Sequence, residues 1–464
     1  MAKVTFLGAC GTVTGSSTLL TWGRTSILVD RGLYQGDDEL EQRNWRRPHF
    51  APHELGAVVV THAHLDHTGL LPRLTNHGFK GPIYCTRPSR GLISLILQDA
   101  GHLQEEQARY ARKAAYSRHV DPEPLYTSGD ARDTLRLLKP VPFEESIELA
   151  PGISCRFFRA GHLLGAASVE ITAKGADGEK RRWCLSGDLG RYDVPILQDP
   201  EPPKEVPDTL VLESTYGDRK HVDSNPVAAF RTRIRRVFER RGSVVIPAFA
   251  LGRTQEVLYH LSALVDSGDL DPEDVFLDSP MAIKATELYD QAEAEHDHEL
   301  KALLEKEIDV LGPDRFQRCR SVEQSKALNF RRKSTVIVAS SGMANGGRVV
   351  HHLKRLLPDK RNAAIFVGYQ AGGTRGRALV DGAESVAIHG EHIPVRAEVE
   401  QLHGLSAHAD REGLIRWCGS LPAPPRRILL NHGEDPARKA LAAALVAADF
   451  PRPILPYVGD AYDW

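Results

Sequence analysis

The chain has 464 residues, a formal net charge of −2 and a hydrophobic fraction of 41%. This length exceeds one compact unit, so two or three domains are expected. The near-neutral charge gives no global electrostatic case for nucleic-acid binding, so any basic groove must be local. No stretch approaches the ~20 apolar residues of a membrane span. Residues 1–8 lead directly into a strand without a secretory leader, so we expect a cytoplasmic protein without a membrane partner.

The six cysteines are dispersed and contain no C-x-x-C pair. This usage is typical of a reducing compartment and argues against a cysteine zinc site.

The first part of the chain alternates strand-like runs with turns. Strands are expected at residues 3–8, 18–21, 26–30, 57–61, 82–86, 154–159, 168–173, 182–186 and 209–213. Helical patterns cover residues 89–115 and 131–138. This mixture predicts sheets with helices outside them, an α/β architecture.

Between residues 214 and 389 the order becomes strand, loop, helix, which is typical of a parallel sheet. The strand and helix pairs are 243–247 with 253–265, 275–278 with 282–294, and 335–340 with 347–357. A helix after Asn225 and Pro226 carries arginines on one face, for which a solvated surface is the favoured interpretation. After residue 390 short strands return, followed by a strand at 426–431 and a helix at 436–449.

The most informative motif is His62-Ala63-His64-Leu65-Asp66-His67, directly after the apolar run at residues 57–61. Alternate residues of an extended chain face the same way, so His62 and His64 can face one ion. Asp66 and His67 come where the chain should turn into a helix and can face a second ion. Isolated histidines and aspartates are usually caps or solvated surface. Four of them in this pattern favour a two-metal hydrolase, and imidazole with carboxylate suits zinc.

Further polar residues close other predicted strands, although a single one is usually a turn former. They are Asp30, His162, Asp188, Glu213 and His432. Two ions about 3.5–4 Å apart would share Asp188 and a hydroxide. We assign one ion to His62, His64 and His162, and the other to Asp66, His67 and His432.

This H-x-H-x-D-H motif with a later His and Asp resembles the metallo-β-lactamase superfamily. The remainder resembles its β-CASP branch, nucleases that include the mRNA 3′-end cleavage subunit and bacterial ribonucleases. The resemblance implies an αββα sandwich formed by residues 1–213 and 390–464. An α/β β-CASP cap domain with a parallel sheet, residues 214–389, would interrupt it.

Three motifs carry the β-CASP resemblance. They are Leu212-Glu213-Ser214-Thr215-Tyr216-Gly217, Leu405-Ser406-Ala407-His408-Ala409-Asp410 and Asn431-His432-Gly433-Glu434. RNA-directed members of the branch have a histidine in the third motif, whereas DNA-directed members have an apolar residue. His432 therefore implies an RNA substrate.

The implied reaction is hydrolysis of an RNA phosphodiester with two Zn²⁺ ions, in which a metal-bridging hydroxide attacks phosphorus in line. Asp66 and Asp188 take part as ligands, and His408 is the expected general acid. Glu213 would orient His408 and keep it protonated, while Asp30 would hold the His-rich loop without binding metal. The family implies 5′-phosphate and 3′-hydroxyl products, and endonucleolytic cleavage is favoured.

Phosphate contacts are expected from a glycine-rich loop that opens a helix, although a tight turn explains such a loop equally well. The candidates are Gly342, Gly346, Gly347, Arg253 at the start of another helix, and Ser406. A Lys-Ala-x-Asn segment containing Lys326 and Asn329 also resembles the family, but its residues indicate no role.

Other interpretations are a 5′-3′ exoribonuclease, a DNA nuclease of the same branch, a small-molecule metallo-hydrolase and a scaffold without activity. A small-molecule hydrolase would have no evident use for the interrupting segment, Glu213 and His408. A scaffold without activity would have lost metal ligands, whereas this chain has all seven. The sequence leaves open the mode of cleavage, the RNA target, the physiological metal and the oligomeric state, and a homodimer is compatible with it.

Overall fold

The structure, a computed structural model, describes residues 2–114, 122–175, 178–221, 225–368, 370–402 and 404–463. They form two compact units. The first comprises Met1–Asp193, Asp199–Lys220 and His408–Trp464, and the second Val194–Gln198 and His221–Ala407. Every helix among the described residues is too short or too polar to cross a bilayer.

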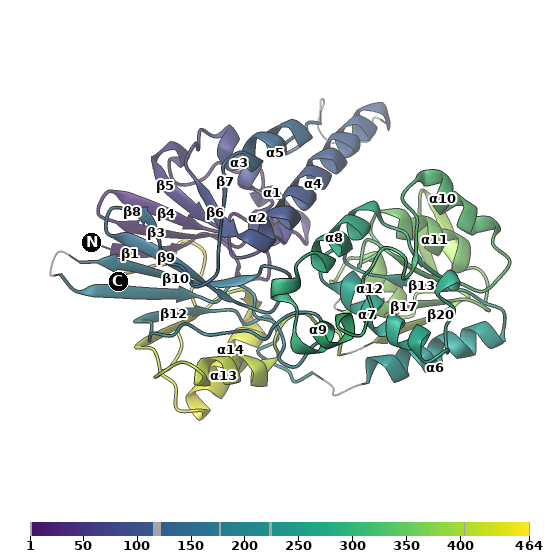
Figure 1. Ribbon diagram of the computed structural model, residues 1–464. Helices are drawn as coiled ribbons and strands as arrows, with labels where there is room; N and C mark the ends of the chain where they lie inside the picture. Colours follow the sequence, from purple (N-terminus) through teal and green to yellow (C-terminus); the bar gives the residue numbers. More distant parts are fainter. Residues whose placement is uncertain are drawn as a thin grey trace. The chain divides into compact units, whose positions relative to one another are not determined.

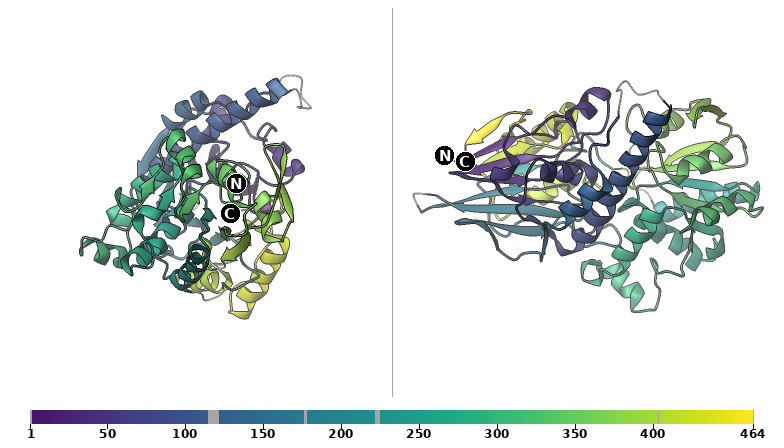
Figure 2. Two further views of the ribbon diagram at one scale, coloured as in Figure 1. Left: turned by 90° about the vertical axis from the view of Figure 1, so that its right-hand side faces the viewer. Right: turned by 90° about the horizontal axis from the view of Figure 1, so that it is seen from above.

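The first unit contains a seven-stranded sheet with the order β23-β1-β3-β4-β5-β6-β7. Its strands are Ala461–Asp463 (β23), Ala2–Phe6 (β1), Thr18–Trp22 (β3), Thr25–Val29 (β4), Leu55–Val59 (β5), Ile83–Thr86 (β6) and Leu138–Val141 (β7). Strands β4 to β7 pair in parallel, so the carboxyl ends of β4 and β5 open at one edge. The antiparallel pair β1 and β23 brings the two chain ends side by side (Figure 2).

A six-stranded sheet faces the first one and has the order β21-β12-β11-β10-β9-β8. Its strands are Arg427–Leu430 (β21), Thr209–Leu212 (β12), Lys180–Leu185 (β11), Ala167–Lys174 (β10), Ile153–Arg159 (β9) and Ile147–Ala150 (β8). Val4 and Phe6 of one sheet and Phe157, Val169 and Trp183 of the other belong to one buried core. Alternate apolar residues from each strand fill this space, as in other packed sheets.

Helices cover both outer faces of this sandwich (Figure 1). They are Asp38–Arg43 (α1), Leu65–Thr68 (α2), Leu71–Asn76 (α3), Arg87–Ala114 (α4), Ser128–Leu135 (α5), Arg411–Gly419 (α13) and Asp435–Ala447 (α14). The predicted αββα arrangement is therefore confirmed. Residue 115, the expected end of the long helix, lies outside the described residues. A short parallel pair, Cys10–Gly11 (β2) with Gly433–Glu434 (β22), lies beside the larger sheets.

The second unit is built on a parallel sheet with the order β15-β14-β16-β13-β17-β20, which confirms the predicted sheet type. The strands are Gln317–Arg318 (β15), Val275–Leu277 (β14), Val336–Ala339 (β16), Val244–Pro247 (β13), Ala363–Val367 (β17) and Glu398–Leu402 (β20). Because β20 pairs with β17, residues 390–407 lie in this unit, although the sequence places them with the last part of the first domain.

Helices surround this sheet, and a hairpin of Ser385–Ile388 (β18) and Glu391–Pro394 (β19) adds to it. The helices are Pro226–Glu239 (α6), Arg253–Asp266 (α7), Pro280–Asp290 (α8), His298–Leu304 (α9), Val322–Ala327 (α10), Arg348–Leu356 (α11) and Arg375–Val380 (α12). Short 3-10 turns occur at Pro52–Glu54 (η1), Pro272–Asp274 (η2), Glu293–Glu295 (η3) and Leu328–Phe330 (η4).

The arginine face of α6 is engaged in ion pairs. Arg236 contacts both Glu398 and Glu400 of β20, and Arg233 and Arg240 contact one of them each. Strand β20 lies at the edge of its sheet, so these ion pairs tie α6 to the edge strand. The three arginine side chains remain 27–48% exposed, so this face is a partly solvated surface that also carries ion pairs.

Candidate metal centre

The His-rich motif follows β5, which ends at Val59, and continues into α2, so that Asp66 and His67 lie in the first turn of this helix. His62 is fully buried, and its Nε2 lies 3.2 Å from His64 Nδ1. His162, which follows β9, places Nε2 3.1 Å from the same His64 nitrogen. Asp188 Oδ2 lies 3.5 Å from His62 Nε2 and 3.7 Å from His162 Nε2. These four side chains point one ligand atom each at a common space.

A second group converges beside the first. His67 Nε2 lies 3.2 Å from His432 Nε2, and His432 Nε2 lies 3.4 Å from Asp66 Oδ2. Asp188 again takes part, because its Oδ1 lies 3.3 Å from His67 Nε2. The structure therefore brings together all seven expected ligands, with the two oxygens of Asp188 facing different groups.

The carboxylate of Asp188 is held by the turn after β11. Gly187 has φ of 57°, and a Cβ there would lie 2.8 Å from the Ala167 carbonyl oxygen. Only glycine adopts this conformation at little cost and lets the backbone pass so close to β10. The turn aims Asp188 between the two histidine groups.

Both groups fit zinc. A tetrahedral zinc ion with Zn–N distances of about 2.0–2.1 Å holds its nitrogen ligands about 3.3 Å apart, close to the separations observed here. Burial lowers the pKa of His64 to about 4, and burial with the charge of His67 lowers that of His62 well below its usual range. Both imidazoles are therefore neutral at pH 7, the form that binds a metal.

Asp30 orients His67 from behind. It follows β4 with φ of 59°, a left-handed conformation that is uncommon outside glycine. Its Oδ2 lies 2.8 Å from His67 Nδ1 and accepts a hydrogen bond from Thr61 Oγ1, and its Oδ1 accepts one from the Thr61 amide. This bond directs the Nε2 lone pair of His67 into the second group. Burial lowers the pKa of His67, but Asp188 and Asp30 raise it well above its usual value.

Thr215 has the corresponding place beside His432, and the sequence analysis missed it, as it missed Thr61. Thr215 Oγ1 lies 3.1 Å from His432 Nδ1 and also contacts the His432 carbonyl oxygen. His432 itself has φ of 48° after β21. Positive φ at a candidate ligand, His432, and at Asp30, which contacts another, is a backbone strain typical of functional sites. The sequence held a signal for both, since Thr61 directly precedes His62 and Thr215 lies in the same motif as Glu213.

His408 and Glu213 form a pair at the open side of the centre. His408 Nδ1 lies 3.2 Å from Glu213 Oε1 and 4.0 Å from Asp188 Oδ2. Glu213 also accepts hydrogen bonds from the amides of Leu189 and Thr215, which fix its carboxylate. Burial lowers the pKa of His408, but Glu213 and then Asp188 and Asp66 raise it to about 9.

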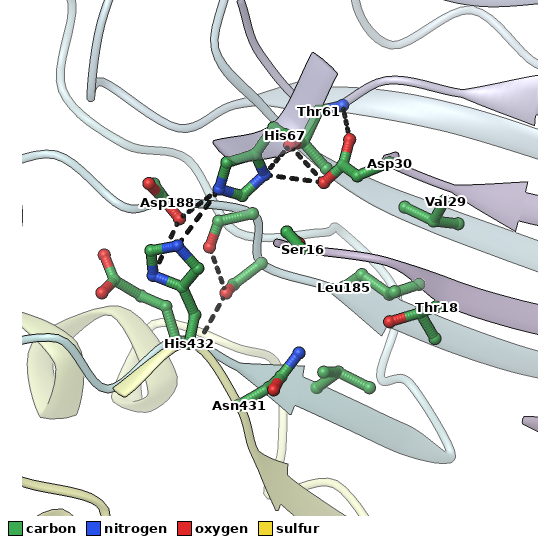
Figure 3. Close-up of a pocket in the computed structure, with 14 residues that line it drawn as sticks. Ser16, Thr18, Val29, Asp30, Thr61, His67, Leu185, Asp188, Asn431 and His432 are labelled. Carbon is green, nitrogen blue, oxygen red and sulfur yellow. Dashed lines mark hydrogen bonds and ion pairs between the residues drawn. The ribbon is translucent and has the colours of Figure 1, made fainter. Parts of the chain in front are cut away.

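Exposure differs across the centre. His62, His67, His162, Asp188 and His432 are buried, whereas His64, Asp66 and His408 are partly exposed. Figure 3 shows His67, Asp188 and His432 pointing toward one another, with Asp30 behind His67. A cavity of about 30 Å³ lies there between residues of both sheets, which is room for at least one water molecule. Access to the centre is therefore from the side of the partly exposed ligands.

The predicted phosphate contacts lie in the second unit, where several already have structural roles. Gly342 is buried, and a Cβ there would lie 2.7 Å from the Phe249 ring. Gly347 has φ of 73° and passes close to the Ser340 carbonyl, whereas Gly346 is exposed. Close packing and a tight turn therefore explain Gly342 and Gly347, and the Gly346 amide donates a hydrogen bond to the Ser341 hydroxyl.

The two other predicted contacts differ in exposure. Arg253 at the start of α7 is only 5% exposed and its guanidinium contacts Glu256. Ser406 is half-buried and belongs to the second unit, whereas His408 belongs to the first. Arg253 therefore has a carboxylate partner within its own helix.

Sequence profiles of three protein families match the chain. The metallo-β-lactamase superfamily matches residues 10–247, the Beta-Casp domain residues 254–379, and the Zn-dependent metallo-hydrolase RNA specificity domain residues 392–452.

Curated relatives match along nearly the whole chain. Ribonuclease TTHA0252 of Thermus thermophilus is 36% identical over 96% of both chains. The transcription termination factor FttA of Methanosarcina mazei is 33% identical over 96% of this chain and 68% of its own, and that of Methanocaldococcus jannaschii is 32% identical over 93% and 67%. A crystal structure described as a protein of unknown function from Enterococcus faecalis V583 has 13% identity and a TM-score of 0.55 over both whole chains, which shows a shared fold.

Proposed function

Because the chain belongs to the metallo-β-lactamase superfamily and to its β-CASP branch, we propose that it is a zinc-dependent ribonuclease. It cleaves RNA phosphodiester bonds within the strand and leaves 5′-phosphate and 3′-hydroxyl ends. The observation that carries the proposal is the pair of ligand groups joined by Asp188, with the His408–Glu213 pair at its open side.

His62, His64 and His162 would hold one zinc ion, Asp66, His67 and His432 a second, and Asp188 both. Bound zinc would lower the pKa of a water molecule toward neutrality and neutralise charge on the phosphate oxygens. Asp30 and Thr215 contribute by fixing which nitrogen of His67 and of His432 faces the ion.

His408 supplies the proton that the leaving 3′ oxygen needs when its bond to phosphorus breaks. Its Nδ1 faces Glu213, so Nε2 is the nitrogen that delivers the proton. The buried carboxylate stabilises the protonated imidazole at neutral pH, as a general acid requires. The 2′-hydroxyl of RNA has no part in this step, so the chemistry alone does not distinguish RNA from DNA.

Three observations support RNA as the substrate. His432 occupies the position of the third β-CASP motif and lies in the second ligand group. The profile that matches residues 392–452 is that of an RNA specificity domain. The relative that is 36% identical over 96% of both chains is named a ribonuclease.

The test is cleavage of single-stranded RNA and of DNA of the same sequence, each labelled in turn at the 5′ and the 3′ end. We expect internal RNA cuts that a chelator abolishes and added zinc restores, with products that a 5′-phosphate-dependent exonuclease degrades. Release of 5′ mononucleotides alone would indicate exonucleolytic cleavage. Preference for DNA, or cleavage that resists chelation, would refute the proposal.

A further inference from the structure

Helix α10 and the 3-10 turn η4 of the second unit form one helical path with a single buried face. Ala327 and Leu328, at the junction, both have right-handed helical φ and ψ. Ser325 donates a hydrogen bond to buried Asp278, and Leu328 is 5% exposed. Residues three and four apart share a helix face, so Val322, Lys326 and Phe330 lie together on the opposite face, which is exposed.

Phe330 is the most exposed large apolar side chain among the described residues, at 84%. Val322, two turns earlier on the same face, is 52% exposed. An aromatic side chain this exposed buries little apolar area in the fold, and a ring held on a helical turn has the form of a stacking platform for a nucleobase.

The segment around Phe330 is basic, and most of its charges are already paired. Arg318 and Arg320 contact Glu287, and Arg331 and Lys333 contact Asp274. Two other cations of the segment, Lys326 and Arg332, are different. Among the described residues, no carboxylate lies within ion-pair distance of Lys326 or Arg332, and both side chains are exposed. They are available to bind an anion.

We propose that Lys326, Asn329, Phe330 and Arg332, here called the Phe330 patch, bind single-stranded RNA outside the metal centre. A nucleobase stacks on Phe330, and Lys326 and Arg332 contact the adjoining phosphates. The exposed amide of Asn329 is placed to bond a base edge or a ribose hydroxyl. The inference depends on the proposed function only in its choice of RNA as the ligand. Two exposed cations within four residues of Phe330, neither in an ion pair among the described residues, favour a polyanion over an apolar protein surface.

The test measures binding of a fluorescent single-stranded RNA to the full-length zinc-loaded protein in a His408→Ala background, which slows turnover. Phe330→Ala is expected to weaken binding about fivefold or more, the lower end of what loss of one base stack produces. Phe330→Trp should retain affinity and Phe330→Leu should not, because leucine keeps apolar area but lacks a ring face. A fully duplex RNA should bind all of these variants equally.

The phosphate contacts have their own signature. Lys326→Ala combined with Arg332→Ala should reduce the slope of log affinity against log salt by about 1.4, since each phosphate contact on a single strand contributes about 0.7. Lys306→Ala is the matched control, because Lys306 is also exposed in the second unit but outside the patch. It should leave the slope almost unchanged.

Unchanged RNA affinity in Phe330→Ala would overturn the inference. So would equal losses in Phe330→Ala and Lys306→Ala, or a change of oligomeric state with constant RNA affinity, which would assign the patch to a protein interface. All variants should keep the melting temperature of the parent protein. Because binding is measured without cleavage, absence of nuclease activity would refute the proposed function and leave this result standing.

Discussion

Replacing Asp30 with asparagine should weaken the second ligand group and spare the first. The carboxylate makes three contacts of 2.8–2.9 Å, one to the Thr61 amide and two through Oδ2 to the Thr61 hydroxyl and His67 Nδ1. Asparagine can keep its oxygen on the Thr61 amide. Its NH₂ group then takes the place of Oδ2, where an acceptor is required.

The amide hydrogens would meet His67 Nδ1 and favour the tautomer that carries its proton on Nε2. That nitrogen is the one that faces His432 and Asp188, so it could no longer bind zinc. Loss of a charge-assisted hydrogen bond costs about 1.5–3 kcal/mol. Loss of such a supporting contact typically lowers metal affinity about 10–100-fold, or about 1.4–2.7 kcal/mol. The two magnitudes agree.

The assay is zinc content by mass spectrometry after dialysis against buffers of graded free zinc. Wild-type protein should retain two ions over a range where Asp30→Asn retains one. Asp37→Asn is the matched control, because Asp37 is an exposed helix cap and asparagine caps a helix as well. Equal zinc affinity in Asp30→Asn and wild type would refute the reasoning, as would equal loss of both ions.

Three further predictions follow from single contacts. His408→Ala should lower kcat about 10²–10⁴-fold with zinc content unchanged, and a normal kcat would exclude it as the proton donor. Burial raises the pKa of Asp278, but hydrogen bonds, above all from His352, lower it below its ordinary value near 3.8. The ionised Asp278 carboxylate therefore stabilises the fold above pH 3.8, and this stabilisation is lost as the pH falls below that value. The urea midpoints of wild type and Asp278→Asn should therefore converge in acid. A difference between the two midpoints that does not change with pH would contradict this. Gly187→Ala should destabilise the protein by about 1–3 kcal/mol, because position 187 has φ of 57° and the new Cβ would lie 2.8 Å from the Ala167 carbonyl oxygen. An unchanged melting temperature would show that alanine is accommodated there without strain.

The sequence predicted the features that depend on local order. Apolar runs that end in His162, Asp188 and His432 indicated strands with ligands at their ends, and the structure places these side chains together. The alternation of strands and helices between residues 214 and 389 predicted the parallel sheet of the second unit. The mixture of strands and helices, with the family resemblance, predicted the sandwich of the first.

Features that depend on contacts between distant residues were not predicted. Thr215 contacts His432, which is 217 residues further along the chain, and no pattern in a single sequence shows that these two side chains lie together. The ion pairs of the α6 arginines were not predicted, because the partner carboxylates, Glu398 and Glu400, lie on a strand far along the chain. The same strand, β20, places residues 390–407 in the second unit through its pairing with β17.

The order of the proposed ligands along the chain has a consequence for biosynthesis. His62 to Asp188 precede the second unit, whereas His408 and His432 follow it. A chain that stops before residue 408 has neither the proton donor nor the fourth ligand of the second group. By the proposed mechanism, an incomplete translation product would be unable to cleave RNA, its own message included, and the second ligand group would be complete only after nearly all of the protein had been made.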